Sequence, residues 1–128
     1  MSDAGTAARI LIVEDNDKNM KLARDILQAQ GYATLEAVTG EEGVRLAREH
    51  VPDLVLMDIQ LPGINGIEAL RQLRADAATA AIPVVAVTAS VMQTDRREIT
   101  AAGFDGYIGK PISLKPFIET VRGHVKGK

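Results

Sequence analysis

The sequence lacks cysteine and tryptophan and is poor in aromatic residues, with two tyrosines and two phenylalanines among its 128 residues. The absence of cysteine excludes disulfide bonds and metal sites built from thiolates. No apolar run approaches the roughly 20 residues that a transmembrane helix needs, and the N-terminus lacks the basic and then apolar segments of a signal peptide. We therefore expect a cytoplasmic protein without membrane insertion.

An excess of charge of one sign is also missing. The chain has 15 basic and 17 acidic residues, which gives a formal net charge of −2 at pH 7. Domains that bind nucleic acid usually carry a basic face, so we expect no nucleic-acid partner. The glycine-rich phosphate-binding motifs of dinucleotide and nucleotide enzymes are absent as well, which disfavours both classes.

The length indicates one domain, because a chain of this size buries roughly two thirds of the surface that its unfolded form would expose. The sequence shows no internal repeat, low-complexity stretch or linker. We expect a flexible N-terminal tail over residues 1–8, a single domain over residues 9–126, and no output domain.

Short apolar runs alternate with longer segments of helical period, the pattern of βα units in a parallel sheet. The runs at 53–57 and 83–87 are almost entirely aliphatic, which is typical of strands covered on both faces. We predict an α/β, flavodoxin-like, doubly wound five-stranded parallel sheet of order 2-1-3-4-5 with helices on both faces. The predicted strands are 9–13, 33–38, 53–57, 83–87 and 105–109, and the predicted helices are 17–30, 40–50, 65–75, 92–101 and 113–126.

Local signals mark several helix ends. Thr39 and Asn65 each stand three residues before a glutamate, the spacing of an N-cap pair. Gly31 and Gly103 stand where a helix is expected to stop, since glycine accepts the left-handed conformation found there.

Polar residues follow four of the five predicted strands. Glu14 and Asp15 come after the first strand, Asp58 after the third, Thr88 after the fourth and Lys110 after the fifth. The carboxyl ends of neighbouring parallel strands meet at one edge of the sheet, where such folds bind ligands. We therefore expect these five side chains to surround one crevice.

Three carboxylates in one crevice favour a bound cation. Each pair would repel by about 1 to 4 kcal/mol, depending on the local dielectric. Only oxygen ligands are available there, which favours Mg²⁺. The alternative is that these are ordinary solvated or capping groups, and Asp15 or Asp17 could each cap the first helix. The convergence of several strand ends favours the metal site.

Mg²⁺, a hydroxyl and a lysine all stabilise phosphoryl oxygens, and a carboxylate is a competent nucleophile that can form an aspartyl phosphate. Asp58 is the best candidate acceptor because it stands alone after a central strand, whereas Glu14 and Asp15 are adjacent and suited to sharing the metal. Lys110 would supply a positive charge and Thr88 a hydrogen bond to the phosphoryl group. The bond between Lys110 and Pro111 could be cis or trans.

The motifs that carry this chemistry resemble the response-regulator receiver domain of two-component signalling, over nearly the whole chain and in family order. The resemblance implies that Asp58 accepts a phosphoryl group from a phosphohistidine on a sensor histidine kinase or phosphotransfer protein. The protein would then be no enzyme but a signalling module that assists its own phosphorylation and slow autodephosphorylation. The matching segments are Leu11–Asn16, Leu56–Gly66, Val87–Ala89 and Lys110–Pro111.

The resemblance also assigns roles to further residues. Mg²⁺ would be held by Glu14, Asp15, Asp58 and the backbone carbonyl of Gln60. Thr88 would turn toward the phosphoryl group while Tyr107 changes between exposed and buried, although a lone aromatic residue is more often simple packing. The positions of Gln60 and Ser90 bear on the lifetime of the phosphoryl group in this family.

Within the family, three segments resemble the DivK-type single-domain regulators of cell division and polarity in alphaproteobacteria. They are Asn16–Leu22, Gln28–Tyr32 and Lys110–Ser113. Receiver domains of hybrid kinases can look similar, so a stand-alone regulator and an excised domain both remain open.

Three functional hypotheses follow. The first is a phosphorylation-controlled binding module, read by a downstream kinase or adaptor protein through the fourth helix, fifth strand and fifth helix. The second is an aspartyl-phosphate phosphatase for small molecules, which usually has a second aspartate two residues after its nucleophile, where this chain has Gln60. The third is an adaptor that acts without phosphorylation. Plausible contacts on the binding face are Met92, Arg96, Ile99 and Tyr107.

Overall fold

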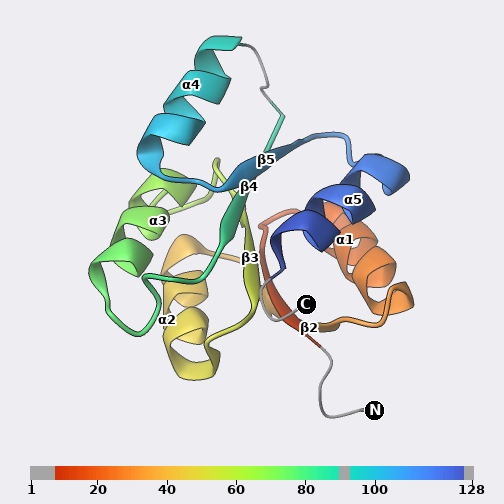
Figure 1. Ribbon diagram of the computed structural model, residues 1–128, viewed down its shortest axis with the longest axis horizontal. Helices are drawn as coiled ribbons and strands as arrows, with labels where there is room; N and C mark the ends of the chain where they lie inside the picture. The colour runs from red at the N-terminus through yellow and green to blue at the C-terminus, as the bar shows by residue number, and fades with distance from the viewer. Residues whose placement is uncertain (1–7, 90–92, 126–128) are drawn as a thin grey trace.

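The computed structural model describes residues 8–89 and 93–125, with the side chains of 93–96 outside the description. Strands and helices alternate along the chain (Figure 1). Ser90 and Met92 lie outside the described residues, as does the side chain of Arg96. The elements are β1 Arg9–Val13, α1 Asp17–Ala29, β2 Ala33–Ala37, α2 Gly40–His50, β3 Leu54–Asp58, α3 Gly66–Ala75, β4 Val84–Thr88, α4 Gln93–Ala102, β5 Gly106–Gly109 and α5 Leu114–His124.

The five strands form one sheet in the order β2-β1-β3-β4-β5, and every neighbouring pair is parallel. The predicted fold class and strand order are confirmed. The register pairs Val13 with Met57, Asp58 with Val87 and Thr88 with Gly109. The polar residues at the carboxyl ends of four strands therefore lie within two residue positions of one another across the sheet.

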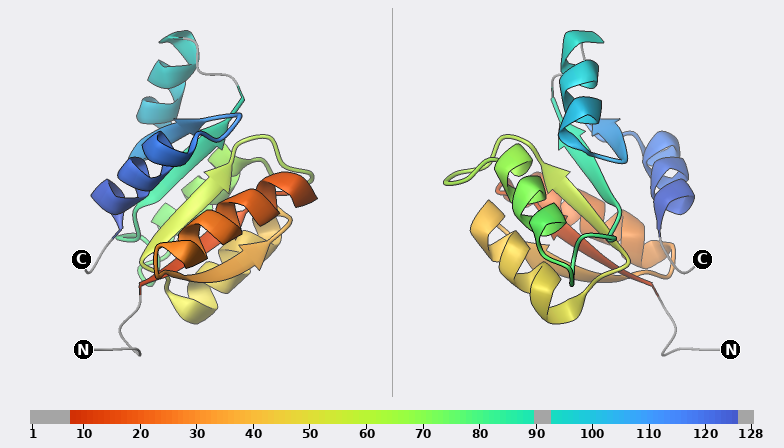
Figure 2. Two further views of the ribbon diagram at one scale, coloured as in Figure 1. Left: turned by 90° about the vertical axis from the view of Figure 1, so that its right-hand side faces the viewer. Right: turned by 60° about the vertical axis from the view of Figure 1, so that its left-hand side comes forward.

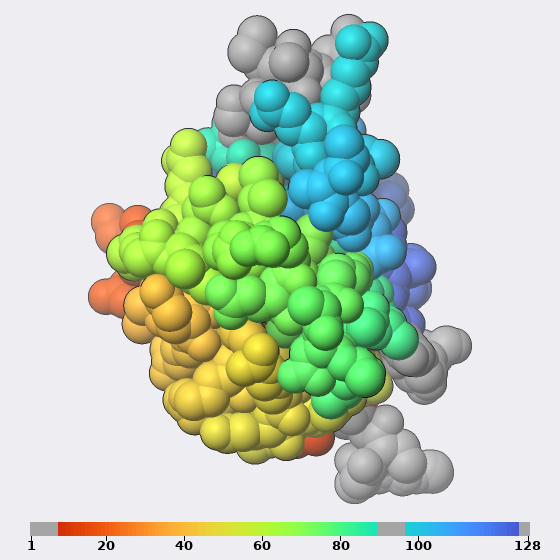
Figure 3. Space-filling view, turned by 90° about the vertical axis from the view of Figure 1, so that its left-hand side faces the viewer, coloured from red at the N-terminus to blue at the C-terminus, as the bar shows by residue number. Residues whose placement is uncertain are grey.

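Helices cover both faces of the sheet. Figure 2 shows α1 and α5 on one face and α2 and α3 on the other, and Figure 3 shows α2, α3 and α4 side by side over that second face. β1 contributes Ile10 and Ile12 to the first layer of the core and Leu11 and Val13 to the second. Every residue of β3 and β4 is buried, as their aliphatic sequences predicted. Each valine, leucine or methionine side chain in these two strands contributes about 1.5 to 3 kcal/mol on burial.

The helix signals in the sequence agree with the structure at most ends. Thr39 and Asn65 cap α2 and α3, each accepting a hydrogen bond from the backbone N–H three residues later. Gly31 and Gly103 have φ of +92° and +107°. At α1 the alternative that Asp15 or Asp17 is the cap is wrong. Asn16 caps α1, because its Oδ1 accepts from Asn19 N at 3.0 Å.

Two strands end one residue later than predicted, and this matters for the site. Asp58 is the last residue of β3 and Thr88 the last of β4, because parallel partners continue the ladder to those positions. At the other end of the chain, Ala8 of the expected tail is buried, and its carbonyl accepts from Ala33 N at 2.9 Å. Among the described residues, no helix is both long and apolar enough to cross a membrane.

Candidate functional site

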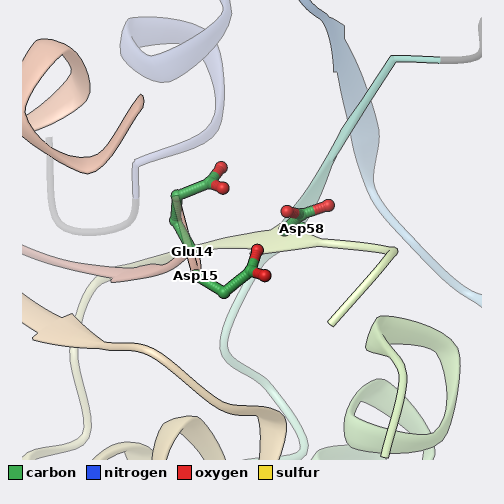
Figure 4. Close-up of side chains that lie close together, drawn as sticks. All are labelled: Glu14, Asp15 and Asp58. Carbon is green, nitrogen blue, oxygen red and sulfur yellow. The ribbon is translucent and has the colours of Figure 1, made fainter. Parts of the chain in front are cut away.

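The site lies at the carboxyl end of the sheet, where the loops after β1, β3, β4 and β5 meet. Figure 4 shows the carboxylates of Glu14, Asp15 and Asp58 gathered there, two from the end of β1 and one from the end of β3. One oxygen of each lies within 4.8 Å of one oxygen of each of the others. The predicted convergence of the three carboxylates is confirmed.

The three carboxylates differ in their surroundings. Glu14 and Asp58 are each only 4% exposed, whereas Asp15 is exposed. A buried carboxylate needs hydrogen bonds or a counter-charge, because desolvation disfavours its ionised form. The protein supplies both through loops that follow the strands.

Lys110 joins the two buried carboxylates. Its Nζ donates to Asp58 Oδ2 at 3.0 Å and stands 3.0 Å from Glu14 Oε1. Burial alone would lower the pKa of Lys110, but the hydrogen bonds and charges of Glu14 and Asp58 outweigh it and raise that pKa. Lys110 is therefore held in its charged form between the two groups.

Backbone N–H groups fix the direction of each buried carboxylate. Asn16 N donates to Glu14 Oε2 at 3.1 Å, and Gln60 N donates to Asp58 Oδ1 at 3.0 Å. Burial is the largest influence on Glu14 and raises its pKa, and the neighbouring charge of Asp58 acts in the same direction. The Lys110 hydrogen bond opposes the rise without cancelling it. The three carboxylates of the site together carry more negative charge than the single Lys110 neutralises.

The donor set fits a hard divalent cation. Ligands on opposite sides of Mg²⁺ stand about 4 Å apart, since each bond is about 2.0 to 2.1 Å long. Carboxylate oxygens already within 4.8 Å of one another need only small side-chain adjustments to share one ion. The combination of three carboxylates without sulfur or imidazole matches the preference of Mg²⁺.

The structure also places Thr88, Lys110 and Tyr107 near one another along β4 and β5. Thr88 is buried, and its carbonyl accepts from Lys110 N at 2.9 Å, so the two residues are joined through the backbone. The peptide bond between Lys110 and Pro111 is cis. Tyr107 is half-buried and packs against the core layer that contains α2 and α3, consistent with the packing interpretation.

Gly66 has a role that we did not predict from the sequence. Gly66 is the first residue of α3. A Cβ at this position would lie 2.5 Å from the carbonyl oxygen of Asp58, so only glycine lets the helix start this close to the strand end. The signal available in the sequence was that glycine, a poor helix former, occupies the first turn of a helix whose N-cap is marked.

Comparison with known proteins agrees with this geometry. A family model described as the response regulator receiver domain matches residues 10–122. The polar-differentiation response regulator DivK of Brucella ovis is 49% identical over 116 residues, which cover 91% of this chain and 94% of that protein.

Solved structures show the same fold. The receiver domain of a sensor histidine kinase from Pseudomonas aeruginosa, with a magnesium ion coordinated in its active-site cleft, superposes with a TM-score of 0.85 at 31% identity. That match covers 92% of this chain and 97% of the other. The chemotaxis protein CheY4 of Vibrio cholerae has a TM-score of 0.87 at 23% identity, with 93% and 99% covered, and supports the fold alone.

Proposed function

The chain belongs to the response regulator receiver family, and from this premise we propose that Asp58 is its phospho-acceptor. The phosphoryl group would come from a phosphohistidine on a sensor histidine kinase or phosphotransfer protein. The observation that carries the proposal is the charge arrangement around Asp58, which is buried, oriented by Gln60 N and paired with Lys110.

In the proposed transfer, an oxygen of Asp58 forms a bond to phosphorus while the bond from phosphorus to the donor imidazole breaks. The imidazole leaves with the electron pair of that bond and takes up a proton. Lys110 already faces Asp58 Oδ2, so its charge is in place for the phosphoryl oxygens. The donor histidine must approach from the exposed side of the site, where Asp15 lies.

We propose Glu14, Asp15, Asp58 and the backbone carbonyl of Gln60 as the groups that hold Mg²⁺. The bound ion would neutralise charge on the phosphoryl oxygens. The clustered carboxylates support this assignment, and so does the magnesium ion in the related Pseudomonas aeruginosa receiver.

We propose that phosphorylation changes a binding face through Thr88 and Tyr107. A phosphoryl group that hydrogen-bonds Thr88 and Lys110 in only one arrangement shifts the population toward that arrangement. The backbone link between these two residues would make them move together. Tyr107 lies on β5 opposite Ala86 of β4, two residues from the β4 end that carries Thr88.

The biological role that we propose is control of the cell cycle or cell polarity. It rests on the 49% identity to a polar-differentiation response regulator. The signal would leave through a downstream kinase or adaptor protein that reads the face formed by α4, β5 and α5. We further propose a cytoplasmic location and no nucleic-acid partner.

Incubation with acetyl phosphate and Mg²⁺, followed by intact-mass analysis, tests the acceptor. We expect a gain of one phosphoryl group that Asp58→Asn abolishes and that removal of Mg²⁺ with a chelator prevents. Asp53→Asn is the matched control, because Asp53 stands just before the amino end of β3, the strand that Asp58 ends.

The remaining hypotheses give different results in that experiment. Turnover of a general phosphoester at enzymatic rates would favour a phosphatase. No labelling of the wild-type protein by any donor would favour an adaptor that acts without phosphorylation, and either result would overturn the proposal.

A further inference from the structure

The loop between β3 and α3, residues 59–65, carries the Gln60 carbonyl that we assign to Mg²⁺. One end is hydrogen-bonded to β3, and the two ends are hydrogen-bonded to each other. Gln60 N donates to Asp58 Oδ1 at 3.0 Å, and Gly66 N donates to Ile59 O at 2.9 Å. The middle of the loop needs a separate support.

That support comes from the N-terminal turn of α2, more than 20 residues earlier in the sequence. Ile64 N donates to Glu41 Oε2 at 3.3 Å. In the part of the chain that the structure describes, this is the one hydrogen bond made by residues 61–64. Figure 3 shows the loop, in yellow-green, beside the orange start of α2.

Two glycines allow this close approach. Gly63 has φ of +74°, and a Cβ on it would lie 2.7 Å from Glu41 Oε2. A Cβ on Gly40 would lie 2.7 Å from Ile64 Cγ1 and 2.8 Å from Ile64 O. The Glu41 carboxylate and the Gly40 backbone are therefore in close contact with the loop, with no room for an added side chain between them.

An ordinary helix-capping role does not account for Glu41. Acidic residues are favoured in the first turn of a helix by its dipole, and Glu41 and Glu42 both occupy that turn. The Glu42 side chain makes its hydrogen bond at the N-terminus of its own helix, where its Oε1 accepts from Val38 N at 3.0 Å. Glu41 reaches instead across to the β3–α3 loop.

We infer that Glu41 is a positioning residue for the magnesium site, which holds the β3–α3 loop so that the Gln60 carbonyl faces the ion. The inference rests on the proposed role of Gln60. It predicts that loss of the Glu41 contact weakens the binding of Mg²⁺ without unfolding the metal-free protein.

The test is the affinity for Mg²⁺ alone, measured by titration calorimetry, together with amide hydrogen exchange of the metal-free protein. We expect Glu41→Ala to weaken binding about threefold to tenfold, less than loss of a partner that touches a ligand directly. Exchange at Ile64 should become faster while the urea midpoint stays unchanged. Glu41→Gln should stay within about twofold of wild type, because its amide oxygen can still accept from Ile64 N.

Two controls, Glu42→Gln and Gly123→Ala, and a second test variant, Gly40→Ala, separate positioning from charge and helix stability. Glu42→Gln removes the same charge from the same turn and should leave the affinity near that of wild type. Gly40→Ala should weaken binding although alanine favours helices, because its Cβ displaces Ile64. Gly123→Ala, where a Cβ meets nothing within 4 Å, should not.

The possible failures are distinguishable. Equal losses in Glu41→Gln, Glu41→Ala and Glu42→Gln would mean that charge alone acts, and unchanged binding in Glu41→Ala and Gly40→Ala would mean that the loop needs no support. Either result overturns the inference and leaves the proposed function standing. A wild-type protein that fails to bind Mg²⁺ would overturn both, whereas one that binds Mg²⁺ but is not labelled by acetyl phosphate would overturn the proposed function alone.

Discussion

The two ends of the same sheet use carboxylates in opposite ways. At the amino end, Asp53 Oδ2 accepts from Arg9 N at 2.8 Å, so it satisfies the first backbone N–H of β1. Asp105 Oδ2 accepts from Val84 N at 2.8 Å and from Arg74 Nη2 at 2.9 Å. At the carboxyl end, Glu14 and Asp58 share one lysine.

This difference distinguishes carboxylates that stabilise the fold from carboxylates that form the site. Each amino-end carboxylate completes a hydrogen-bonding need of the fold, so its removal leaves a backbone group without a partner. The carboxyl-end cluster concentrates like charge in a buried place, where burial raises the pKa of Glu14. Such a cost is typical of a site arranged for a ligand. Mutations at the amino end should therefore lower the stability and leave metal binding unchanged. Mutations at the carboxyl end should weaken metal binding without lowering the stability.

The largest effect should follow Arg74→Ala at the amino end. Arg74 donates to Ala80 O at 3.1 Å and Ile82 O at 2.6 Å, and it pairs with Asp105. We expect the free energy of unfolding to fall by about 2 to 3 kcal/mol, because the carbonyls and Asp105 lose a charged donor. Urea denaturation measures this change, and Mg²⁺ affinity should be unaffected.

Arg71→Ala is the matched control for that prediction. Arg71 lies on the same helix and pairs with Glu68, but its side chain is 76% exposed. Its replacement should leave the urea midpoint unchanged. If Arg74→Ala were no more destabilising than Arg71→Ala, the amino-end contacts would not have the structural role that the comparison gives them.

At the carboxyl end, Asp15→Asn should weaken Mg²⁺ binding about tenfold, or about 1.4 kcal/mol, because a charged ligand becomes neutral. The stability of the metal-free protein should stay unchanged, since Asp15 is exposed. Calorimetric titration with Mg²⁺ measures the affinity. Asp17→Asn, an exposed aspartate at the start of α1, is the control, and equal losses in both variants would contradict a specific ligand role.

Glu14→Gln should stabilise the metal-free protein at pH 7, because it removes the charge of a buried group whose pKa is raised by burial. Since the folded pKa of Glu14 is raised, folding binds protons. Ionised Glu14 therefore destabilises the protein above that pKa, and the cost disappears as the pH falls through it toward the ordinary value of 4.5. The stability gain should accordingly shrink in urea titrations at lower pH.

Asp53→Asn provides the contrast for Glu14→Gln, because it replaces a carboxylate that caps the backbone at the other end of the sheet. This variant should not stabilise the protein at any pH. A stabilising Asp53→Asn, or a Glu14→Gln gain that is independent of pH, would remove the distinction between the two ends.

The smallest effect concerns strain near the amino end of β3. Val51 has φ of +45° at the end of α2, a left-handed conformation that is costly for a β-branched residue. Val51→Asn should stabilise the protein by about 0.5 to 1 kcal/mol, with unchanged Mg²⁺ affinity. Thermal unfolding measures this change in stability. Val38→Asn is the control, since Val38 is similarly exposed at 51% but does not have a positive φ. Equal shifts in the two variants would exclude strain as the cause.

Local sequence patterns were sufficient for much of the fold. The aliphatic runs predicted β3 and β4 as strands covered on both faces, and Thr39 and Asn65 marked two helix starts. At α1 the sequence offered Asp15 or Asp17 as an alternative cap, and this alternative was wrong because Asn16, which lies between them, is an equally suitable cap. Only the backbone path decides which of them reaches Asn19 N.

The sequence by itself determined the alternation of strands and helices, the polar residues at the ends of four strands and hence the convergence of three carboxylates. These follow from short-range periodicity and from the shared direction of parallel strands. Only the tertiary structure decided that Lys110 lies between Glu14 and Asp58, and that Glu41 supports the loop after Asp58. Such contacts join residues far apart in the chain, and they depend on the packing of whole layers, which no local pattern encodes.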